Sequence, residues 1–308
     1  MKFDTLKFTA LLFIMTTSLF SCHKDDNSVL NSADKFRLSK ILKYSNSTAS
    51  KLTGEVDYAY DEKGNMVKES FYDCNPAKIL WMYREYEYSE NKKIKEKIFD
   101  GASGNLTLGS FTEYIYNGNQ LLREETYCGR GCDGSLINSM NYEYDERGNI
   151  IRKYMNDPVL GILGDMKYTY DNQNKLILEE TAETGVSDYY YKYLKHIYDN
   201  NSREIKLEYY NTNQDLIRYT EKVYKETSIL PETEIQYDKN GSPTLKYRNV
   251  YDEWGNLTET IINDNYLKFK RKYNGTLLIE EINYWEQDSV PGGQTSESGM
   301  SRYEYENF

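Results

Sequence analysis

Short runs in which two tyrosines flank one intervening residue recur along the chain. Examples are Tyr58-Ala59-Tyr60, Tyr86-Glu87-Tyr88 and Tyr142-Glu143-Tyr144. A spacing of two places both aromatic side chains on one face of a strand and the intervening residue on the other face. The runs therefore predict half-buried antiparallel strands.

The second tyrosine of each run, termed here the marker tyrosine, recurs at a nearly regular interval. The ten markers are Tyr60, Tyr88, Tyr116, Tyr144, Tyr170, Tyr198, Tyr224, Tyr251, Tyr273 and Tyr305. Neighbouring markers are mostly 26 to 28 residues apart, as their residue numbers show. Such a period is typical of proteins in which one supersecondary unit is copied and stacked.

A turn motif directly follows most markers. Residues 60–65, 144–149 and 251–256 read Tyr-Asp-x-x-Gly-Asn. The Asp can accept hydrogen bonds from the backbone ahead of it, and the Gly can adopt the left-handed conformation that closes a hairpin with a bulge. Asn117-Gly118 and Asn274-Gly275 suit the shorter type I′ turn. Asp238-Lys239-Asn240-Gly241 is interpreted as another hairpin turn rather than a calcium loop.

Aliphatic residues or Met stand six positions after most markers and are expected to begin the returning strand on its core face. They are Met66, Ile94, Leu122, Ile150, Leu176, Leu257 and Ile279. In the unit at Tyr198 the turn is expected to be one residue longer, so that Ile205 takes this role.

The predicted fold is all-β. Ten units of about 28 residues, each a Tyr-Asp hairpin, give an antiparallel meander of roughly 20 strands over residues 36–308, which we expect to form a single β-repeat domain. Because open sheets beyond about 10 strands tend to curl, split or close, the sheet is expected to curl into a wide sheet, a spiral or a barrel.

These motifs resemble the tyrosine-aspartate (YD) repeats of the Rhs family, which read Tyr-Asp-x-x-Gly-Asn/Arg-Leu. The resemblance covers about residues 54–308 and is strongest at Tyr60, Tyr144 and Tyr251. In that family the repeats form a spiralling β-sheet shell around a toxin. The chain is too short for a complete shell, so the resemblance implies the strand–turn–strand unit and not encapsulation. The chain also resembles uncharacterised Bacteroidetes lipoproteins whose meander sheet curls into a porin-like barrel.

Residues 1–21 have the features of a signal peptide, with basic Lys2 and Lys7 before an apolar segment too short to span a membrane. Leu19-Phe20-Ser21-Cys22 resembles a lipobox, which implies lipidation of Cys22; the alternative is an ordinary secretion signal. The following Lys24, Asp25 and Asp26 resemble the export signal of Bacteroidetes surface lipoproteins. This resemblance implies an outer-membrane lipoprotein facing the cell exterior, with the periplasmic face as the alternative. Residues 22–35 then form the lipidated Cys and a flexible tether.

Charge restricts the partners. The formal net charge of −11 disfavours binding to nucleic acid or to an anionic membrane surface. Charged residues within runs such as residues 83–88 also disfavour lipid-facing strands. The expected membrane contact is therefore the lipid anchor.

Residues with potential for catalysis have structural roles in the repeat. Of the two histidines, His23 lies in the tether and His196 occupies a tyrosine position, so it is interpreted as a strand residue rather than a base or metal ligand. The repeated aspartates have turn roles. No enzyme activity, metal or cofactor is expected, and a hydrolase using a carboxylate pair is the less favoured alternative.

The cysteines suggest one further structural site. Cys128 and Cys132 flank a Gly-rich loop and are the favoured disulfide. Cys74 would have to reach across about four strands, or ~19 Å, and its state is left open.

Longer connections are expected at the edge away from the Tyr-Asp turns, and binding sites tend to lie on such loops. They are Asp73 to Lys78, Asp100 to Gly109, Cys128 to Asn138, Asn156 to Asp165 and Gln287 to Gly299. Trp81 and Trp285 lie near this edge and Trp254 lies in a turn, and all three are ligand-binding candidates. Ser289, in Asp288-Ser289-Val290, resembles an O-glycosylation site of Bacteroidetes envelope proteins.

The sequence as a whole predicts a surface-anchored, non-catalytic lipoprotein that displays a β-repeat scaffold for binding a glycan or an envelope or host protein. A structural or accessory subunit of an outer-membrane complex is the alternative.

Overall fold

The computed structural model describes residues 36–101, 105–181, 191–286 and 295–307. These residues form 20 antiparallel strands, and none of them is helical. Within the described residues no helix has the length and apolar character needed to cross a membrane. The all-β prediction and the number of strands are confirmed.

The strands follow one another along the chain with short connections. Their bounds are β1 (Phe36–Tyr44), β2 (Leu52–Tyr60), β3 (Met66–Asp73), β4 (Ile79–Ser89), β5 (Lys92–Asp100), β6 (Thr107–Asn117), β7 (Gln120–Cys128), β8 (Leu136–Tyr144), β9 (Ile150–Asp157), β10 (Gly161–Tyr170), β11 (Leu176–Thr181), β12 (Tyr193–Tyr198), β13 (Glu204–Tyr210), β14 (Leu216–Tyr224), β15 (Pro231–Asp238), β16 (Pro243–Tyr251), β17 (Leu257–Ile262), β18 (Tyr266–Asn274), β19 (Leu277–Glu286) and β20 (Thr295–Asn307).

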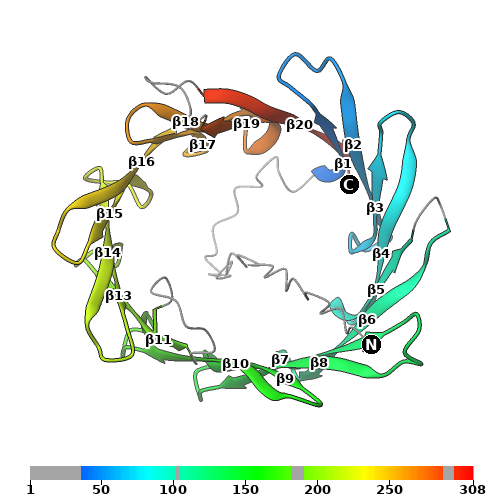
Figure 1. Cartoon of the computed structure of the whole chain (residues 1–308), viewed down its shortest axis with the longest axis horizontal. Coiled ribbons are helices and arrows are strands. Elements are labelled where there is room, and N and C mark those ends of the chain that lie inside the picture. Colours follow the sequence, from blue (N-terminus) through cyan, green and yellow to red (C-terminus); the bar gives the residue numbers. More distant parts are fainter. Residues whose placement is uncertain (1–35, 102–104, 182–190, 287–294, 308) are drawn as a thin grey trace, which may run out of the picture. The chain divides into compact units, whose positions relative to one another are not determined.

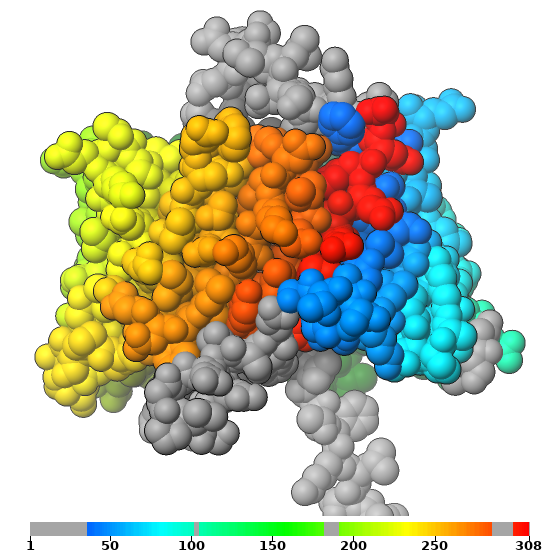
Figure 2. Space-filling view, turned by 90° about the horizontal axis from the view of Figure 1, so that it is seen from above, coloured from blue at the N-terminus to red at the C-terminus, as the bar shows by residue number. Residues whose placement is uncertain are grey.

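The sheet closes on itself. Every strand pairs with its neighbours in the chain, and β1 pairs with β20 from Phe36 opposite Asn307 to Tyr44 opposite Met300. The strands therefore form a complete ring (Figure 1), and β20, in red, lies directly beside β1, in blue (Figure 2). A closed β-barrel removes the unpaired edges that an open sheet would expose, and it decides between the predicted alternatives.

The marker tyrosines all lie near one end of the barrel, termed here the tyrosine rim. Each even-numbered strand runs towards this rim and ends at its marker tyrosine or one or two residues beyond it. Because β1 runs antiparallel to β20, the first described residue, Phe36, also lies at the tyrosine rim. The connections after odd-numbered strands form the opposite rim.

A β-bulge stands beside every marker tyrosine. Ala59 pairs with Lys68 but Tyr60 pairs with Met66, so Val67 is the extra residue. The same shift occurs in the other units, with extra residues Ser39, Ile94, Leu122, Ile151, Ile177, Ile205, Glu232, Thr258 and Ile279. Since a bulge bends its strand and increases the local twist, ten bulges in phase provide the curvature that closure needs.

The marker hydroxyls form a ring of hydrogen bonds around the barrel. The Tyr88 hydroxyl donates to the carbonyl oxygen of Met66, the residue paired with Tyr60, and this relation repeats from unit to unit. The ten carbonyl acceptors belong to Leu38, Met66, Lys93, Leu121, Ile150, Leu176, Glu204, Pro231, Leu257 and Leu278. A bulge disrupts the ladder locally, and the hydroxyl provides a donor for the carbonyl beside it. This explains why the repeat uses tyrosine rather than phenylalanine.

The predicted turn chemistry is confirmed. The Asp61 carboxylate accepts hydrogen bonds from the backbone N–H groups of Lys63 and Asn65, at 2.9 and 2.8 Å, and Gly64 adopts a positive φ of 85°. The same five-residue turn begins at Asp145, Asp171, Asp199 and Asp252 at the tyrosine rim and at Asn211 and Asp238 at the opposite rim. Asp238 is thus a turn residue, as expected.

Three expected core residues were wrong by one position. The hairpins after Tyr88, Tyr116 and Tyr273 have two-residue turns, so the residue opposite the tyrosine comes five positions later and is Lys93, Leu121 or Leu278. Ile94, Leu122 and Ile279 are instead the extra residues of the bulges and are exposed. Side chains alternate between faces, so a change of one residue in the turn moves the predicted residue to the other face.

The turn after Tyr198 was also misread. It has the usual five residues, because Asp199 N–H donates to the Arg203 carbonyl and Ser202 takes the left-handed conformation with φ 65°. Glu204, and not Ile205, therefore pairs with Tyr198. Serine in a position usually held by glycine concealed the motif.

Several connections at the opposite rim are shorter than predicted. The segment from Asn156 to Asp165 contains a connection of only three residues, 158–160, and Leu163 is the extra residue of a bulge in β10. Gly161 lies directly after the turn, and Gly164 lies beside this bulge. Strands β6, β8 and β20 likewise begin inside the predicted loops, at Thr107, Leu136 and Thr295.

Candidate functional site

The three tryptophans do not form one site. Trp81 lies in β4 at the opposite rim and is 47% exposed, whereas Trp254 lies in the turn between β16 and β17 at the tyrosine rim and is 65% exposed. Trp285 lies in β19 opposite Ser296, and its side chain is outside the described part of the structure. Cys22, Lys24, Asp25, Asp26 and Ser289 also lie outside the described residues, so their roles stay predictions.

A pocket of about 360 Å³ lies beside Trp81, where β1 to β4 reach the opposite rim. Its side chains come from two rows across neighbouring strands. Lys43, Gly54 and Asp73 form one row, and Val56 pairs with Phe71 in the next. Directly paired residues point to the same face of the sheet. Because Gly54 has no side chain, the surface between Lys43 and Asp73 is left uncovered and forms the floor of the pocket.

Trp81 reaches this pocket through a bulge. It is the extra residue between the Phe71–Met82 pair and the Tyr72–Leu80 pair. Its ring centroid lies 5.9 Å from that of Phe71, with the planes tilted by 52°. A bulge redirects a side chain out of the regular alternation, and here it gives the pocket an aromatic wall.

A group of charged residues lies behind the pocket, on the other face of β2. Lys40 and Lys78 both donate hydrogen bonds to the Glu55 carboxylate, which is 6% exposed. Burial alone would raise the pKa of Glu55, but these two hydrogen bonds lower that pKa to about 2. The ionised Glu55 thus ties β1 and the β3–β4 connection to β2, which holds the pocket walls in place.

His196 lies in β12, at the position that tyrosine occupies in most other units. Tyr86, Tyr114 and Tyr142 donate from the same position of the repeat to Glu69, Glu96 and Glu124. In its own unit, His196 contacts Glu179 through Nε2 at 3.0 Å and Glu204 through Nδ1 at 2.7 Å.

The protonation state of His196 follows from these contacts. Burial would lower the pKa of His196, but the hydrogen bonds to Glu179 and Glu204 raise it to about 9. An imidazolium with both nitrogens engaged is neither a general base nor a metal ligand at neutral pH.

The pKa shifts of the described carboxyl groups are those of groups held in ion pairs and turns. Wherever the pKa of a described carboxyl group is shifted, it is lowered: Glu55, Asp61, Asp145, Asp165, Asp199, Glu204, Glu208, Asp238 and Asp252. A glycosidase acid needs the opposite shift. The described part of the chain also contains no group of three or more His, Cys, Asp or Glu side chains suited to a metal ion.

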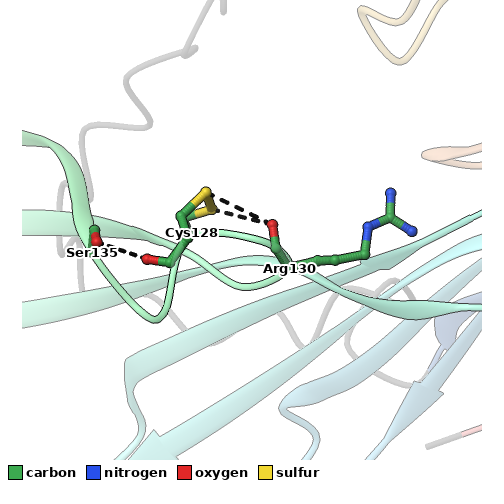
Figure 3. The surroundings of a disulfide bond; sticks show 4 residues. Cys128, Arg130 and Ser135 are labelled. Atoms are coloured by element: carbon green, nitrogen blue, oxygen red, sulfur yellow. Dashed lines mark hydrogen bonds between the residues drawn. A yellow bond between two sulfur atoms is a disulfide. The ribbon is translucent and has the colours of Figure 1, made fainter.

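Cys128 and Cys132 form a disulfide in the connection between β7 and β8, with their Cα atoms 5.6 Å apart (Figure 3). Ser135 Oγ donates to the Cys132 carbonyl at 2.7 Å, and Cys128 N–H donates to the Ser135 carbonyl at 2.9 Å. A β-carbon at Gly129 would lie 2.4 Å from the Leu108 carbonyl oxygen, so this loop needs glycine there. Cys74, the first residue after β3, is a free thiol.

Sequence reasoning missed Gly54 and the residues beside it. The available signal was a single glycine inside an otherwise regular strand pattern, which often marks a close approach of a ligand or of another backbone segment. The strand register, which sequence did not provide, is needed to bring Lys43 and Asp73 to either side of it.

Comparison with known proteins gives structural matches only. No family model and no curated protein matches the chain. Solved structures that match include TcdB2-TccC3-TEV, with 18% identity over 79% of this chain and 13% of that chain at a TM-score of 0.47. A porin-like protein from Bacteroides uniformis matches with 10% identity over 87% of this chain and 98% of its own, at a TM-score of 0.32. The Photorhabdus luminescens Tc holotoxin pore matches with 16% identity over 76% of this chain and 14% of that chain, at a TM-score of 0.41. The chain therefore spans only a small part of the length of these toxin chains.

Proposed function

We propose that the protein is a surface-anchored, non-catalytic lipoprotein whose YD-type repeat barrel presents a glycan-binding or protein-binding site at the rim away from its anchor. One observation carries this proposal. The pocket beside Trp81 opens at the opposite rim, whereas the tether would join the barrel at Phe36 on the tyrosine rim. A lipid on Cys22 would then anchor the barrel through the rim that does not hold the pocket.

A binding role fits the chemistry of the site better than catalysis does. The buried Glu55 is held in ion pairs with Lys40 and Lys78, and His196 is occupied by two carboxylates. An exposed tryptophan over a preformed pocket is a feature of binding sites, since aromatic rings provide contact area at a low cost in conformational entropy.

The binding proposal is tested with residues 22–308 carrying Cys22→Ser, which keeps the chain soluble and unlipidated. This protein is screened on an array of polysaccharides and is used in parallel to capture envelope proteins. We expect retention on a subset of the polysaccharides. Failure on all of them, together with recovery of one outer-membrane protein, would favour the accessory-subunit role.

The location is tested separately in intact cells by adding protease from outside. We expect the wild-type chain to be degraded, and Cys22→Ser to release the protein from the outer membrane. Protection of the wild-type chain in intact cells, followed by degradation after lysis, would place it on the periplasmic face.

A further inference from the structure

We infer that the pocket over Gly54 binds one pyranose ring of a neutral carbohydrate. The inference rests on the proposed binding function and adds the ligand class and the residues that select it. Nine residues line the pocket, and six of them carry the argument: Lys43, Gly54, Val56, Phe71, Asp73 and Trp81.

The polarity of the pocket matches a sugar ring. Trp81 and Phe71 form an apolar wall, against which the C–H face of a pyranose can pack. Lys43 carries only donors and Asp73, when ionised, only acceptors, and both side chains are exposed. Sugar hydroxyls both donate and accept hydrogen bonds, so one ring can use the wall and both polar groups at once.

The charge balance selects a neutral ligand. Lys43 and Asp73 are paired with the same residue, Gly54, from its two sides, so the row carries one positive and one negative group. An acidic sugar or a phosphate would gain from Lys43 but would meet the Asp73 carboxylate across the same floor. Like-charge contact of this kind disfavours the wrong partner.

The pocket is preorganised. Asp73 accepts a hydrogen bond from Asn75 N–H at 3.0 Å, which fixes the carboxylate at the end of β3. Cys74 N–H donates to the Thr53 carbonyl at 3.1 Å, so β2 and β3 stay joined beyond their last paired residues. A rigid site loses less conformational entropy when it binds.

Gly54 offers a direct way to fill the pocket without disturbing the strand. A β-carbon at this position would lie 3.4 Å from the Tyr72 carbonyl oxygen and 3.8 Å from Lys43 Cβ, which are ordinary contacts. Valine is favoured in strands, and its side chain would occupy the floor between Lys43 and Asp73. Gly54→Val should therefore keep the fold and close the site.

The experiment measures affinity for soluble neutral glucan, mannan and xylan, with polygalacturonate and heparin as acidic probes. It uses residues 22–308 with Cys22→Ser. We expect binding to at least one neutral polysaccharide. Gly54→Val and Trp81→Ala should each weaken it at least tenfold, and Lys43→Ala and Asp73→Asn several-fold. Trp254→Ala, an equally drastic change at the tyrosine rim, should leave the affinity within twofold.

Three results would overturn the inference. Binding that survives both Gly54→Val and Trp81→Ala places the glycan elsewhere, although the proposed function stands. Binding of polygalacturonate or heparin alone contradicts the neutral class. Binding of no polysaccharide at all removes the proposed glycan function as well. Circular dichroism and the unfolding midpoint check the fold of Gly54→Val; if that variant does not fold, Trp81→Ala and Lys43→Ala decide.

Discussion

The Tyr60 hydroxyl, in β2, lies 2.7 Å from the carbonyl oxygen of Leu38 in β1, so the circle of tyrosine hydrogen bonds extends to the strand that closes the barrel. Leu38 is paired with Tyr305, whose own hydroxyl donates to Leu278 in the preceding unit. The same side chain that defines the repeat thus completes its closure. Few side chains are deeply buried in the described residues, so these lateral contacts and the closed ladder have a large share in stability.

Removing one hydroxyl from this ring should destabilise the barrel measurably. Tyr144→Phe keeps the aromatic side chain but removes the hydroxyl that donates to the Leu121 carbonyl oxygen at 2.8 Å. A hydrogen bond of this kind contributes about 1 kcal/mol net, and the denaturant midpoint should fall accordingly.

Tyr83→Phe is the matched control for that change. Tyr83 stacks on Phe99 with centroids 4.4 Å apart, and its hydroxyl makes no hydrogen bond to the residues that the structure describes. The midpoint of this variant should stay close to that of the wild type. If both variants lost the same stability, the hydrogen bonds of the marker tyrosines would contribute nothing specific.

The bulge register can be tested with two adjacent leucines. Leu121 pairs with Tyr116, whereas Leu122 is the extra residue of the bulge and is 37% exposed. Leu122→Ser should change the free energy of unfolding by less than about 0.5 kcal/mol, and Leu121→Ser should cost more, about 1–2 kcal/mol. The reverse order, measured by chemical denaturation, would favour the register that the sequence first suggested.

Thiol counting can test the cysteine pairing. In residues 22–308 with Cys22→Ser, three cysteines remain: Cys74, Cys128 and Cys132. A maleimide added to the denatured, unreduced protein should label one thiol per chain, and three after reduction, as read by mass spectrometry. Because the disulfide closes a short loop, reduction should lower the stability by about 2 kcal/mol at most. Labelling of all three thiols before reduction would contradict the pair.

The sequence was sufficient for the repeat but not for the register. Tyr60, Asp61 and Gly64 identify a hairpin by local chemistry alone, and the count of markers predicts the strands. Closure depends on how β1 meets β20, which are separated by nearly the whole chain, and no local pattern encodes that contact. The bulges are equally hidden, because an extra aliphatic residue such as Ile94 looks like a core residue until its partner is known.

The candidate site shows the same division. Trp81 was identified from sequence because a tryptophan near a loop edge is conspicuous. Its pocket was not, because Lys43, Gly54 and Asp73 are brought together only by the pairing of β1, β2 and β3. Glu204 was overlooked for a related reason, since Ser202 replaces the glycine that would have marked the turn before it.

His196 should make the stability of the barrel depend on pH in a defined window. Its pKa is near 6.5 in the unfolded chain and about 9 in the folded protein. The stabilisation from its charged form is therefore complete below pH 6.5 and is lost as pH rises through 9, on the order of 2 kcal/mol in all. The shifted tyrosines titrate from a reference value of about 10, above this window.

His196→Tyr provides the matching variant, because tyrosine is the usual residue at this position and its hydroxyl can donate to Glu179 as Tyr86 donates to Glu69. We expect the free energy of unfolding of the wild type to fall between pH 6.5 and 9, and that of His196→Tyr to fall much less, through the Cys74 thiol, whose pKa is raised by burial in both proteins. Urea denaturation at half-unit pH steps measures both curves. Parallel curves would show that His196 is not the titrating group, whereas a clearly steeper slope in the wild type would identify it as a charged residue of the repeat.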